Sequence, residues 1–229
     1  MNPKKYKKLP DAFLLDMDGT LIDSEHYWIE MESELAKKWG VQWTTEQGKD
    51  LIGNSMEYSF HIFRSLGINM SDEEFLDYFM EGMVAKVKDH VPFRPGALHL
   101  FQLAEEYNIP CCLVTMSHRP LADAFLEQIP KGIFAASVTG DMVENGKPDP
   151  EPYLYAVKLL KEQGHDVSIH DSIAIEDSIP GVNSALASGA ATIGIPLIQS
   201  LKQFQDITLW DTLEGKTIED FEKVLANAQ

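Results

Sequence analysis

Short runs of apolar and β-branched residues recur along the chain, and residues that favour turns bound each run. The runs are Ala12–Asp16, Cys111–Thr115, Ala136–Thr139, Ile173–Glu176, Thr192–Ile195 and Ile207–Trp210. Several of them lack the polar alternation of a half-exposed strand. Continuous apolar runs of this length are typical of strands buried on both faces of a parallel sheet. The pattern therefore predicts a parallel sheet, with the last run as an edge strand.

Segments in which apolar residues recur at helical spacing lie between these runs. They are Gly96–Tyr107, Pro120–Gln128, a segment capped by Asp149 that ends at Gly164, and one that begins at Ser178 and ends at Gly189. We expect Asp149 as the cap because Pro150, which follows it, suits the first position of a helix. The alternation of strands and helices predicts an α/β fold with a doubly wound, Rossmann-like parallel sheet.

Residues 23–91 break this alternation, because helical patterns follow one another there without a strand. The patterns are Ser24–Trp39, Thr45–Ile52, Met56–Leu66 and Asp72–Lys88. One stripe of the first pattern is expected in the core of a small helical bundle. That stripe consists of Trp28, Met31, Leu35 and Trp39. We therefore predict an α/β core formed by residues 1–22 and 92–229, with a helical insertion at residues 23–91.

Composition narrows the range of partners. The chain has 229 residues with 36 Asp+Glu against 19 Lys+Arg, a formal net charge of −17. This charge repels phosphate backbones, so we expect no nucleic-acid partner. No run approaches the about 18 apolar residues of a membrane span, so we expect no membrane partner. Cys111 and Cys112 are adjacent in an apolar run, which indicates small core residues without a disulfide and a cytoplasmic protein. We also expect a monomer.

A pair of acids ends the first predicted strand. Asp16 and Asp18 stand two positions apart and should project to the same side, and Gly19 lets the chain turn sharply after them. Ligands of open α/β sheets bind beyond the carboxyl ends of the strands. A buried acid pair is costly unless it shares a cation or a proton, so this site favours a metal. Taken alone, the pattern could equally be a calcium-like loop or a plain turn instead of a catalytic site.

The loops after the other predicted strands also carry polar residues suited to chemistry. Thr115-Met116-Ser117 offers a hydroxyl and backbone N–H groups at a strand-to-helix turn, which suits phosphate oxygens. Lys147 stands on a proline-stiffened turn just before a helix. Glu176-Asp177 ends another apolar run, and carboxylate oxygens are the ligands that magnesium prefers.

Together these segments resemble the motifs of the haloacid dehalogenase superfamily of phosphotransferases, in the right order and at strand ends. The matching residues are Asp16-Met17-Asp18-Gly19-Thr20, Thr115, Lys147 with the following Pro-Asp-Pro, and Glu176-Asp177-Ser178 followed by Gly181 and Ala185. The resemblance extends from about Asp11 to Pro196. The helical insertion resembles the small helical cap of the branch that contains β-phosphoglucomutase and related sugar-phosphate phosphatases.

The resemblance implies a Mg²⁺-dependent phosphatase that acts on a small phosphorylated metabolite, by default a sugar phosphate. It implies that Asp16 is the nucleophile that forms an aspartyl-phosphate, and that Asp18 is the general acid and base. Thr115 and Lys147 complete the implied catalytic set. The implied metal ligands are Asp16, the backbone carbonyl of Asp18, Asp177, and Glu176 through water. The implied substrate contacts are Gly19, Met116, Ser117, and Asn54 in the cap loop 52–55. The cap is expected to close over the site, with hinges at Leu21–Ser24 and Val91–Pro95.

Other activities remain open at this stage. A phosphomutase uses the same motifs, but in the β-phosphoglucomutase-like pattern an Arg of the cap loop grips a second phosphate, and here Met56 stands near that position. A dehalogenase does not need Asp18. A receiver domain phosphorylated on aspartate is half this length and has no cap. A phosphatase is therefore favoured, while phosphoglycolate, nucleotides and flavin mononucleotide remain possible substrates.

Overall fold

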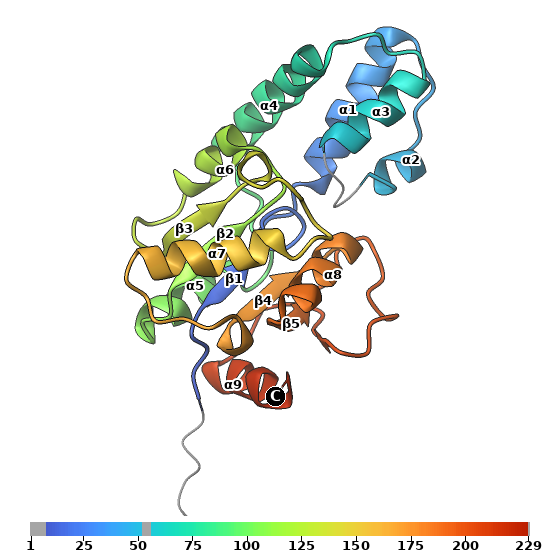
Figure 1. Cartoon of the computed structure of the whole chain (residues 1–229). Helices are drawn as coiled ribbons and strands as arrows, with labels where there is room; N and C mark the ends of the chain where they lie inside the picture. Colours follow the sequence, from blue (N-terminus) through green and yellow to red (C-terminus); the bar gives the residue numbers. More distant parts are fainter. Residues whose placement is uncertain (1–7, 52–55, 229) are drawn as a thin grey trace, which may run out of the picture.

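The computed structural model describes residues 8–51 and 56–228 and contains a six-stranded sheet. The strands are β1 (Phe13–Leu15), β2 (Cys111–Val114), β3 (Phe134–Val138), β4 (Ile173–Glu176), β5 (Ala191–Gly194) and β6 (Thr208–Leu209). Every neighbouring pair is parallel, and the order is β3-β2-β1-β4-β5-β6. The predicted doubly wound α/β fold is confirmed (Figure 1).

Helices cover both faces of the sheet, which explains why the strands lack polar alternation. Those of the core are α5 (Ala97–Glu106), α6 (Arg119–Leu126), α7 (Glu151–Glu162), α8 (Ile179–Ser188) and α9 (Ile218–Ala228). Phe13 and Leu15 of β1 belong to the hydrophobic cluster that includes α5, α6 and α9. Leu14, between them, belongs to the cluster that includes α7 and α8. Successive side chains of β1 therefore meet an apolar layer on either side.

The predicted start of α8 is confirmed, but that of α7 is wrong. The Ser178 hydroxyl caps α8 by accepting a hydrogen bond from the Gly181 N–H. Helix α7 begins at Glu151 and its N-cap is Pro150, not Asp149. Pro152 has no N–H to donate to a cap at Asp149, and Pro150 itself takes the N-cap position with φ −69° and ψ −11°. The Asp149 carboxylate instead accepts a hydrogen bond from the Glu151 N–H at 2.9 Å.

The helical insertion contains α1 (Glu25–Trp39), α2 (Thr45–Lys49), α3 (Met56–Ser65) and α4 (Asp72–Asp89), grouped at one end of the molecule (Figure 1). Met31 and Leu35 are buried as expected, but Trp39 is 41% exposed because it ends α1. The apolar core of these helices is continuous with the cluster on one face of the sheet. The boundaries of the inserted domain, residues 23–91, stay a prediction.

The two connections between the helical insertion and the sheet run side by side. The Asp23 N–H donates to the Pro92 carbonyl at 2.8 Å, and the Arg94 N–H donates to the Leu21 carbonyl at 2.9 Å. Ile22 forms an antiparallel bridge with Phe93 between these hydrogen bonds. The chain therefore enters and leaves the insertion at adjacent points, close to the carboxyl end of β1.

Helix α9 was not predicted from the sequence. Phe221 on this helix packs against Phe13 of β1, with ring centroids 4.9 Å apart, and α9 lies at the opposite end of the molecule from the helical insertion (Figure 1). Cys111 and Cys112 are fully buried in β2, as expected of core residues. Across the described part of the chain, the helices are too short or too polar to cross a bilayer.

Candidate active site

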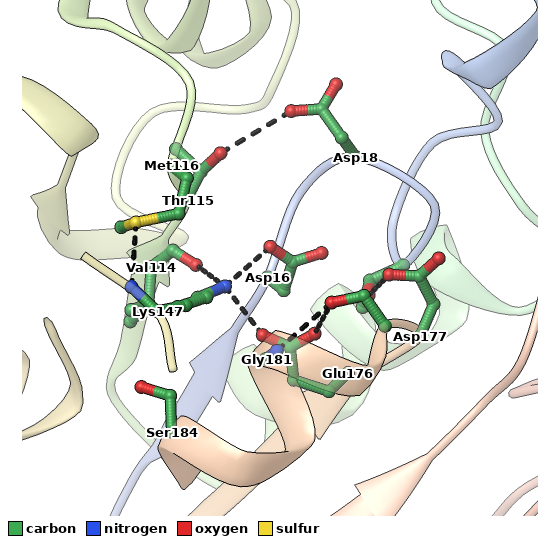
Figure 2. Close-up of polar contacts among 12 residues, drawn as sticks. Asp16, Asp18, Val114, Thr115, Met116, Lys147, Glu176, Asp177, Gly181 and Ser184 are labelled. Atoms are coloured by element: carbon green, nitrogen blue, oxygen red, sulfur yellow. Dashed lines mark hydrogen bonds and ion pairs between the residues drawn. The ribbon is translucent and has the colours of Figure 1, made fainter. Parts of the chain in front are cut away.

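The residues predicted to carry chemistry gather at the carboxyl edge of the sheet. Strands β2, β1 and β4 are neighbours in that order, so the loops that follow them meet there. The gathered residues are Asp16, Asp18 and Gly19 after β1, Thr115, Met116 and Ser117 after β2, Lys147 before α7, and Glu176 and Asp177 at the end of β4. Because β1 lies between β2 and β4, Asp16 occupies the middle of the site (Figure 2).

Lys147 is the buried cation of the site, with a side chain that is 3% exposed. Its ammonium donates to Asp16 Oδ1 at 2.8 Å, to Glu176 Oε1 at 2.6 Å and to the Val114 carbonyl at 2.8 Å (Figure 2). These acceptors use all of the donors that an ammonium has. Burial lowers the pKa of Lys147, but the two carboxylates outweigh burial and hold its pKa above the ordinary value. Lys147 is therefore charged and held in one orientation.

Asp16, Glu176 and Asp177 form a buried acidic cluster beside Lys147. One carboxylate oxygen of each lies within 4.8 Å of the others. Burial and the neighbouring Glu176 raise the pKa of Asp16 to about 7, and burial and Asp16 raise the pKa of Asp177 well above its ordinary value. Asp16 Oδ2 is buried and has no hydrogen-bond partner among the described residues. A cluster of buried carboxylates with excess negative charge fits a divalent cation that prefers oxygen ligands, such as Mg²⁺.

Two glycines make room for this cluster. Gly19 has a φ of 79°, a conformation that favours glycine, and a Cβ at this position would overlap the Asp177 carboxylate. A Cβ at Gly181 would overlap the Glu176 carboxylate in the same way. The chain turns tightly around the acids, and a larger residue at either position would displace one of them.

Asp18 points away from the acidic cluster (Figure 2). Its Oδ1 accepts hydrogen bonds from the Ser24 hydroxyl at 2.5 Å and the Trp28 indole at 3.4 Å. Its Oδ2 accepts from the Ser117 hydroxyl at 2.7 Å and the Thr115 hydroxyl at 3.4 Å. The family resemblance implies that Asp18 contacts the metal through its backbone carbonyl. The direction of its side chain does not test that prediction. The side chain connects the helical insertion to the loop after β2.

The loop after β2 is held by contacts with its neighbours. The Ser117 N–H donates to Thr115 Oγ1 at 3.0 Å, and Met116 Sδ accepts from the Lys147 N–H at 3.2 Å. A Cβ at Gly140 would overlap the backbone of Met116, so this loop packs closely on the segment after β3. The loop therefore lies against Asp18 on one side and Lys147 on the other.

A pocket of about 90 Å³ opens between this edge of the sheet and the helical insertion. From the core it is lined by Asp16, Asp18, Thr115, Met116, Ser117, Lys147, Asp177 and Ser178. From the insertion it is lined by Glu25, Trp28, Ile29, Glu32, Gly48, Leu51, Met56 and Ser59. Asn54 and the rest of the predicted cap loop 52–55 lie outside the described residues.

The acids that α1 presents to the pocket were not predicted from the sequence. Glu25 and Glu32 are each 6% exposed. Burial and the nearby Asp18 raise the pKa of Glu25 to about 8. A signal was present, because positions 25, 28, 29 and 32 share one face of a helix. This face of α1, which includes Trp28, thus carries an acid at each end, Glu25 and Glu32. A helix face that only packs in a core does not carry acids there.

Two further residues that support the site were also missed. Tyr153 on α7 is fully buried, and its hydroxyl donates to Glu176 Oε1 at 2.6 Å. Arg94 donates to the carbonyls of Gly19 and, at 2.6 Å, Ile195, and so braces the loop after β1. Both act across long sequence separations, and no local pattern indicates them.

Several known proteins with related sequences have names that describe phosphatases. A bifunctional riboflavin kinase/FMN phosphatase of Arabidopsis thaliana is 29% identical over 193 residues, which cover 83% of this chain and 49% of that protein. The chain thus spans about half the length of that relative. A phosphorylated carbohydrates phosphatase of Thermotoga maritima is 28% identical over 185 residues, covering 80% of this chain and 83% of that protein.

A solved structure supports the fold, and a family comparison identifies the family. CbbY from Rhodobacter sphaeroides in complex with phosphate has a TM-score of 0.78 and 24% identity, covering 90% of this chain and 96% of that one, and it supports the fold alone. The sequence model of the haloacid dehalogenase-like hydrolases matches residues 13–195, a range that holds the acidic cluster, Lys147 and the helical insertion. The chain belongs to the haloacid dehalogenase-like hydrolase family.

Proposed function

We propose that this protein is a phosphatase that hydrolyses a small phosphomonoester through an aspartyl-phosphate on Asp16. One observation carries the proposal. Asp16 lines the pocket with one oxygen on Lys147 and the other without a partner among the described residues. The free oxygen is available to attack phosphorus, while Lys147 holds the carboxylate in place. A covalent intermediate divides one difficult displacement into two easier ones.

Asp16, Asp177, the Asp18 carbonyl and Glu176 through water would hold Mg²⁺. The acidic cluster supports this assignment because its net charge is negative even with Lys147 charged. When bound, Mg²⁺ supplies positive charge that offsets the repulsion between Asp16 and an anionic phosphate. From the protein itself, Lys147 offers positive charge to Asp16 and Glu176, and Arg94 offers it to Asp177.

Asp18 is the proposed general acid and base. It protonates the departing alcohol in the first step and takes a proton from the attacking water in the second. Its place supports this role, because it lines the same pocket as Asp16. The hydroxyls of Ser24 and Ser117 hold its two oxygens at 2.5 and 2.7 Å. Acid–base help of this kind accelerates a step by about 10²–10⁴-fold.

Thr115, Met116, Ser117 and Gly19 are the proposed contacts of the phosphoryl oxygens, and Lys147, whose donors are engaged, contributes its charge. The Thr115 and Ser117 hydroxyls lie beside Asp18 and can turn toward a bound phosphate. Lys147 adds a fixed positive charge at the floor of the pocket. Most of the catalytic power of phosphoryl transfer comes from such positioning and electrostatic stabilisation.

The helical insertion is proposed to act as a cap, with Asn54 as one of its substrate contacts. It supplies one wall of the pocket, and its paired connections at Leu21–Ser24 and Val91–Pro95 are the proposed hinges. A cap of this kind excludes water and contacts the leaving group. Residues 23–91 would then form a domain of their own.

A phosphatase is favoured over a phosphomutase by the charge of the pocket. A mutase must grip a second phosphate, which calls for a further cation. Lys147 is the one cationic side chain among the described lining residues, and Met56 lines the wall of the insertion. The names of the relatives, which include a phosphorylated carbohydrates phosphatase and a hexitol phosphatase, support a phosphorylated small metabolite as substrate.

Phosphate release from a panel of phosphomonoesters, with and without Mg²⁺, tests the proposal. We expect Mg²⁺-dependent release that Asp16→Asn abolishes and that the exposed Asp206→Asn leaves unchanged. Acid-quenched wild type should carry one phosphoryl group on Asp16 by mass spectrometry. Release by Asp16→Asn at the wild-type rate would contradict the assignment of the nucleophile. Conversion of a hexose 1-phosphate to its 6-phosphate without release would favour the mutase.

A further inference from the structure

A buried arginine stands on the second connection of the helical insertion. Arg94 is 9% exposed, and its backbone N–H donates to the Leu21 carbonyl of the first connection at 2.9 Å. Arginines are seldom buried unless a carboxylate pairs with them. In the acidic cluster nearby, Asp16 and Glu176 already pair with Lys147. The burial of Arg94 therefore calls for an explanation of its own.

The guanidinium of Arg94 makes hydrogen bonds to the backbone of two loops. Within the described part of the chain, Nη1 donates to the carbonyls of Gly19 and, at 2.6 Å, Ile195, and Nη2 donates to the Pro196 carbonyl at 3.3 Å. Gly19 belongs to the loop after β1, whereas Ile195 and Pro196 follow β5. Strand β4 lies between β1 and β5, so the guanidinium connects the two loops across the end of β4.

The loop after β1 lies directly on Asp177, which follows β4. A Cβ at Gly19 would lie 2.1 Å from an oxygen of the Asp177 carboxylate, and the Thr20 hydroxyl donates to Asp177 Oδ1 at 3.5 Å. Burial lowers the pKa of Arg94, and the charge of Asp177 acts in the opposite direction, so the guanidinium also lies within electrostatic range of this carboxylate. A shift of the loop would therefore displace Asp177, which is a proposed metal ligand.

Both polar groups of the Gly19 backbone are held. The carbonyl accepts from Arg94, and the N–H donates to the Ile22 carbonyl at 2.8 Å. The Gly19 N–H shares a planar trans peptide with the Asp18 carbonyl, so the two groups point in opposite directions. The Asp18 carbonyl, the other proposed metal ligand of this loop, therefore points away from Ile22 and cannot turn without breaking that hydrogen bond.

We infer that Arg94 is a positioning residue for the metal. It holds residues 18–20 in the arrangement in which the Asp18 carbonyl and Asp177 bind one cation, and it links that cation to the connections of the helical insertion. The inference rests on the proposed function, since it concerns the Mg²⁺ that the acidic cluster would hold. A lysine would supply the same charge but not the role, because its single nitrogen lacks the rigid fork of a guanidinium.

The affinity for Mg²⁺, measured by calorimetry on metal-free protein without substrate, tests the inference. If Arg94 acted through charge alone, Arg94→Met would bind Mg²⁺ more tightly than wild type, and Arg94→Lys would bind it equally well, because a positive charge repels a cation. We expect instead that both variants bind Mg²⁺ about 10–100-fold more weakly, as is typical when a residue that orients metal ligands is lost. Arg64→Met and Arg64→Lys, at an exposed position of α3, are the matched controls and should bind Mg²⁺ as wild type does.

The outcomes separate this inference from the proposed function. Tighter or unchanged Mg²⁺ binding by either folded variant of Arg94 would overturn the inference and leave the proposed function standing. A wild-type protein that binds no Mg²⁺ would overturn both. Urea unfolding shows whether the variants are folded, and if Arg94→Met is not, Arg94→Lys carries the comparison.

A second variant asks whether Arg94 acts through the loop after β1. Thr20→Val keeps the shape of the side chain and removes the hydroxyl that donates to Asp177. Thr20→Val should also weaken Mg²⁺ binding, and its effect and that of Arg94→Lys should not multiply in the double variant, because both displace the same loop. Effects that multiply would show that the two residues act independently and would contradict the inference.

Hydrogen exchange of wild type tests the link to the helical insertion. Mg²⁺ should slow amide exchange in peptides that cover residues 18–24 and 91–97, because Arg94 joins both segments to the metal site. In Arg94→Lys the effect of Mg²⁺ should persist in residues 18–24 and disappear from residues 91–97. Peptides of α9, at the opposite end of the molecule from the insertion, are the control and should not respond (Figure 1). Exchange in residues 91–97 of wild type that does not change with Mg²⁺ would refute the link.

Discussion

Replacing Lys147 with Met should separate the electrostatic role of this residue from its bulk. Methionine keeps an unbranched chain of similar length but donates no hydrogen bond. The substitution removes the donor from Asp16 Oδ1, Glu176 Oε1 and the Val114 carbonyl. All of these acceptors are buried, so water cannot replace the ammonium without opening the site.

The expected loss of stability is large and depends on pH. Removing one partner of a buried ion pair costs about 3–5 kcal/mol. Below a pH of about 7 the Asp16 carboxyl is protonated in folded wild type, because burial raises its pKa from 3.8 to about 7. Above that pH wild type ionises Asp16 beside Lys147, whereas the variant must keep the proton or bury an unpaired charge. The loss should therefore grow as pH rises through 7 toward 9, and at pH 5 it should be smaller but still include the broken ion pair with Glu176.

Urea unfolding at pH 5, 7 and 9 in the presence of a metal chelator measures this loss. The chelator matters because a bound cation would neutralise the same acids. Lys161→Met, an exposed change on α7, is the control and should alter the free energy of unfolding little at any pH. A loss for Lys147→Met that stays below about 1 kcal/mol, or that does not increase from pH 5 to pH 9, would refute the electrostatic reasoning.

Three other substitutions test the packing and charge around the site. Tyr153→Phe removes the hydroxyl that donates to Glu176 at 2.6 Å, so unfolding in urea should show a loss of about 1.5–3 kcal/mol, and an unchanged midpoint would contradict this. Phe221→Ala empties the contact of α9 with Phe13 and should cost about 3–5 kcal/mol by thermal unfolding, whereas a change under about 1 kcal/mol would show that α9 is dispensable. The free energy of unfolding of Glu32→Gln should increase relative to that of wild type as pH rises from 4.5 to about 8. Over this range the Glu32 carboxyl of wild type ionises in the unfolded chain but not in the folded one, so wild type loses stability. A difference that does not change with pH would exclude this cause.

Local patterns predicted the sheet and the placement of its polar loops. The apolar run Ile173–Glu176 coincides with β4, and Ser178 caps α8 as expected. The rule that carboxyl ends of parallel strands share one edge then brought Asp16 and Asp177 together. These successes share one cause, since each depends on residues adjacent in sequence or on the parallel topology alone.

The rest depended on contacts that distant parts of the chain make. The partners of Tyr153 and Arg94 lie on other elements, so their spacing carries no signal. The burial of Glu32 was not predicted, because Gly48 of α2, which lies against its carboxylate, comes 16 residues later in the chain. Near the prolines that flank Asp149, helix α7 begins one residue later than predicted. Propensity alone does not resolve a difference of one residue.

The paired connections at Asp23–Pro92 and Leu21–Arg94 also bear on how the chain folds. Strand β1 pairs with β2 although about 95 residues separate them, and closing so long a loop has a high entropic cost. Once the insertion has formed, its ends are joined, and the effective loop between the strands shortens to about 28 residues. The logarithmic dependence on loop length makes this difference about 1 kcal/mol in favour of pairing. The insertion would thus raise the rate at which the central strands meet, a kinetic contribution separate from its place at the pocket.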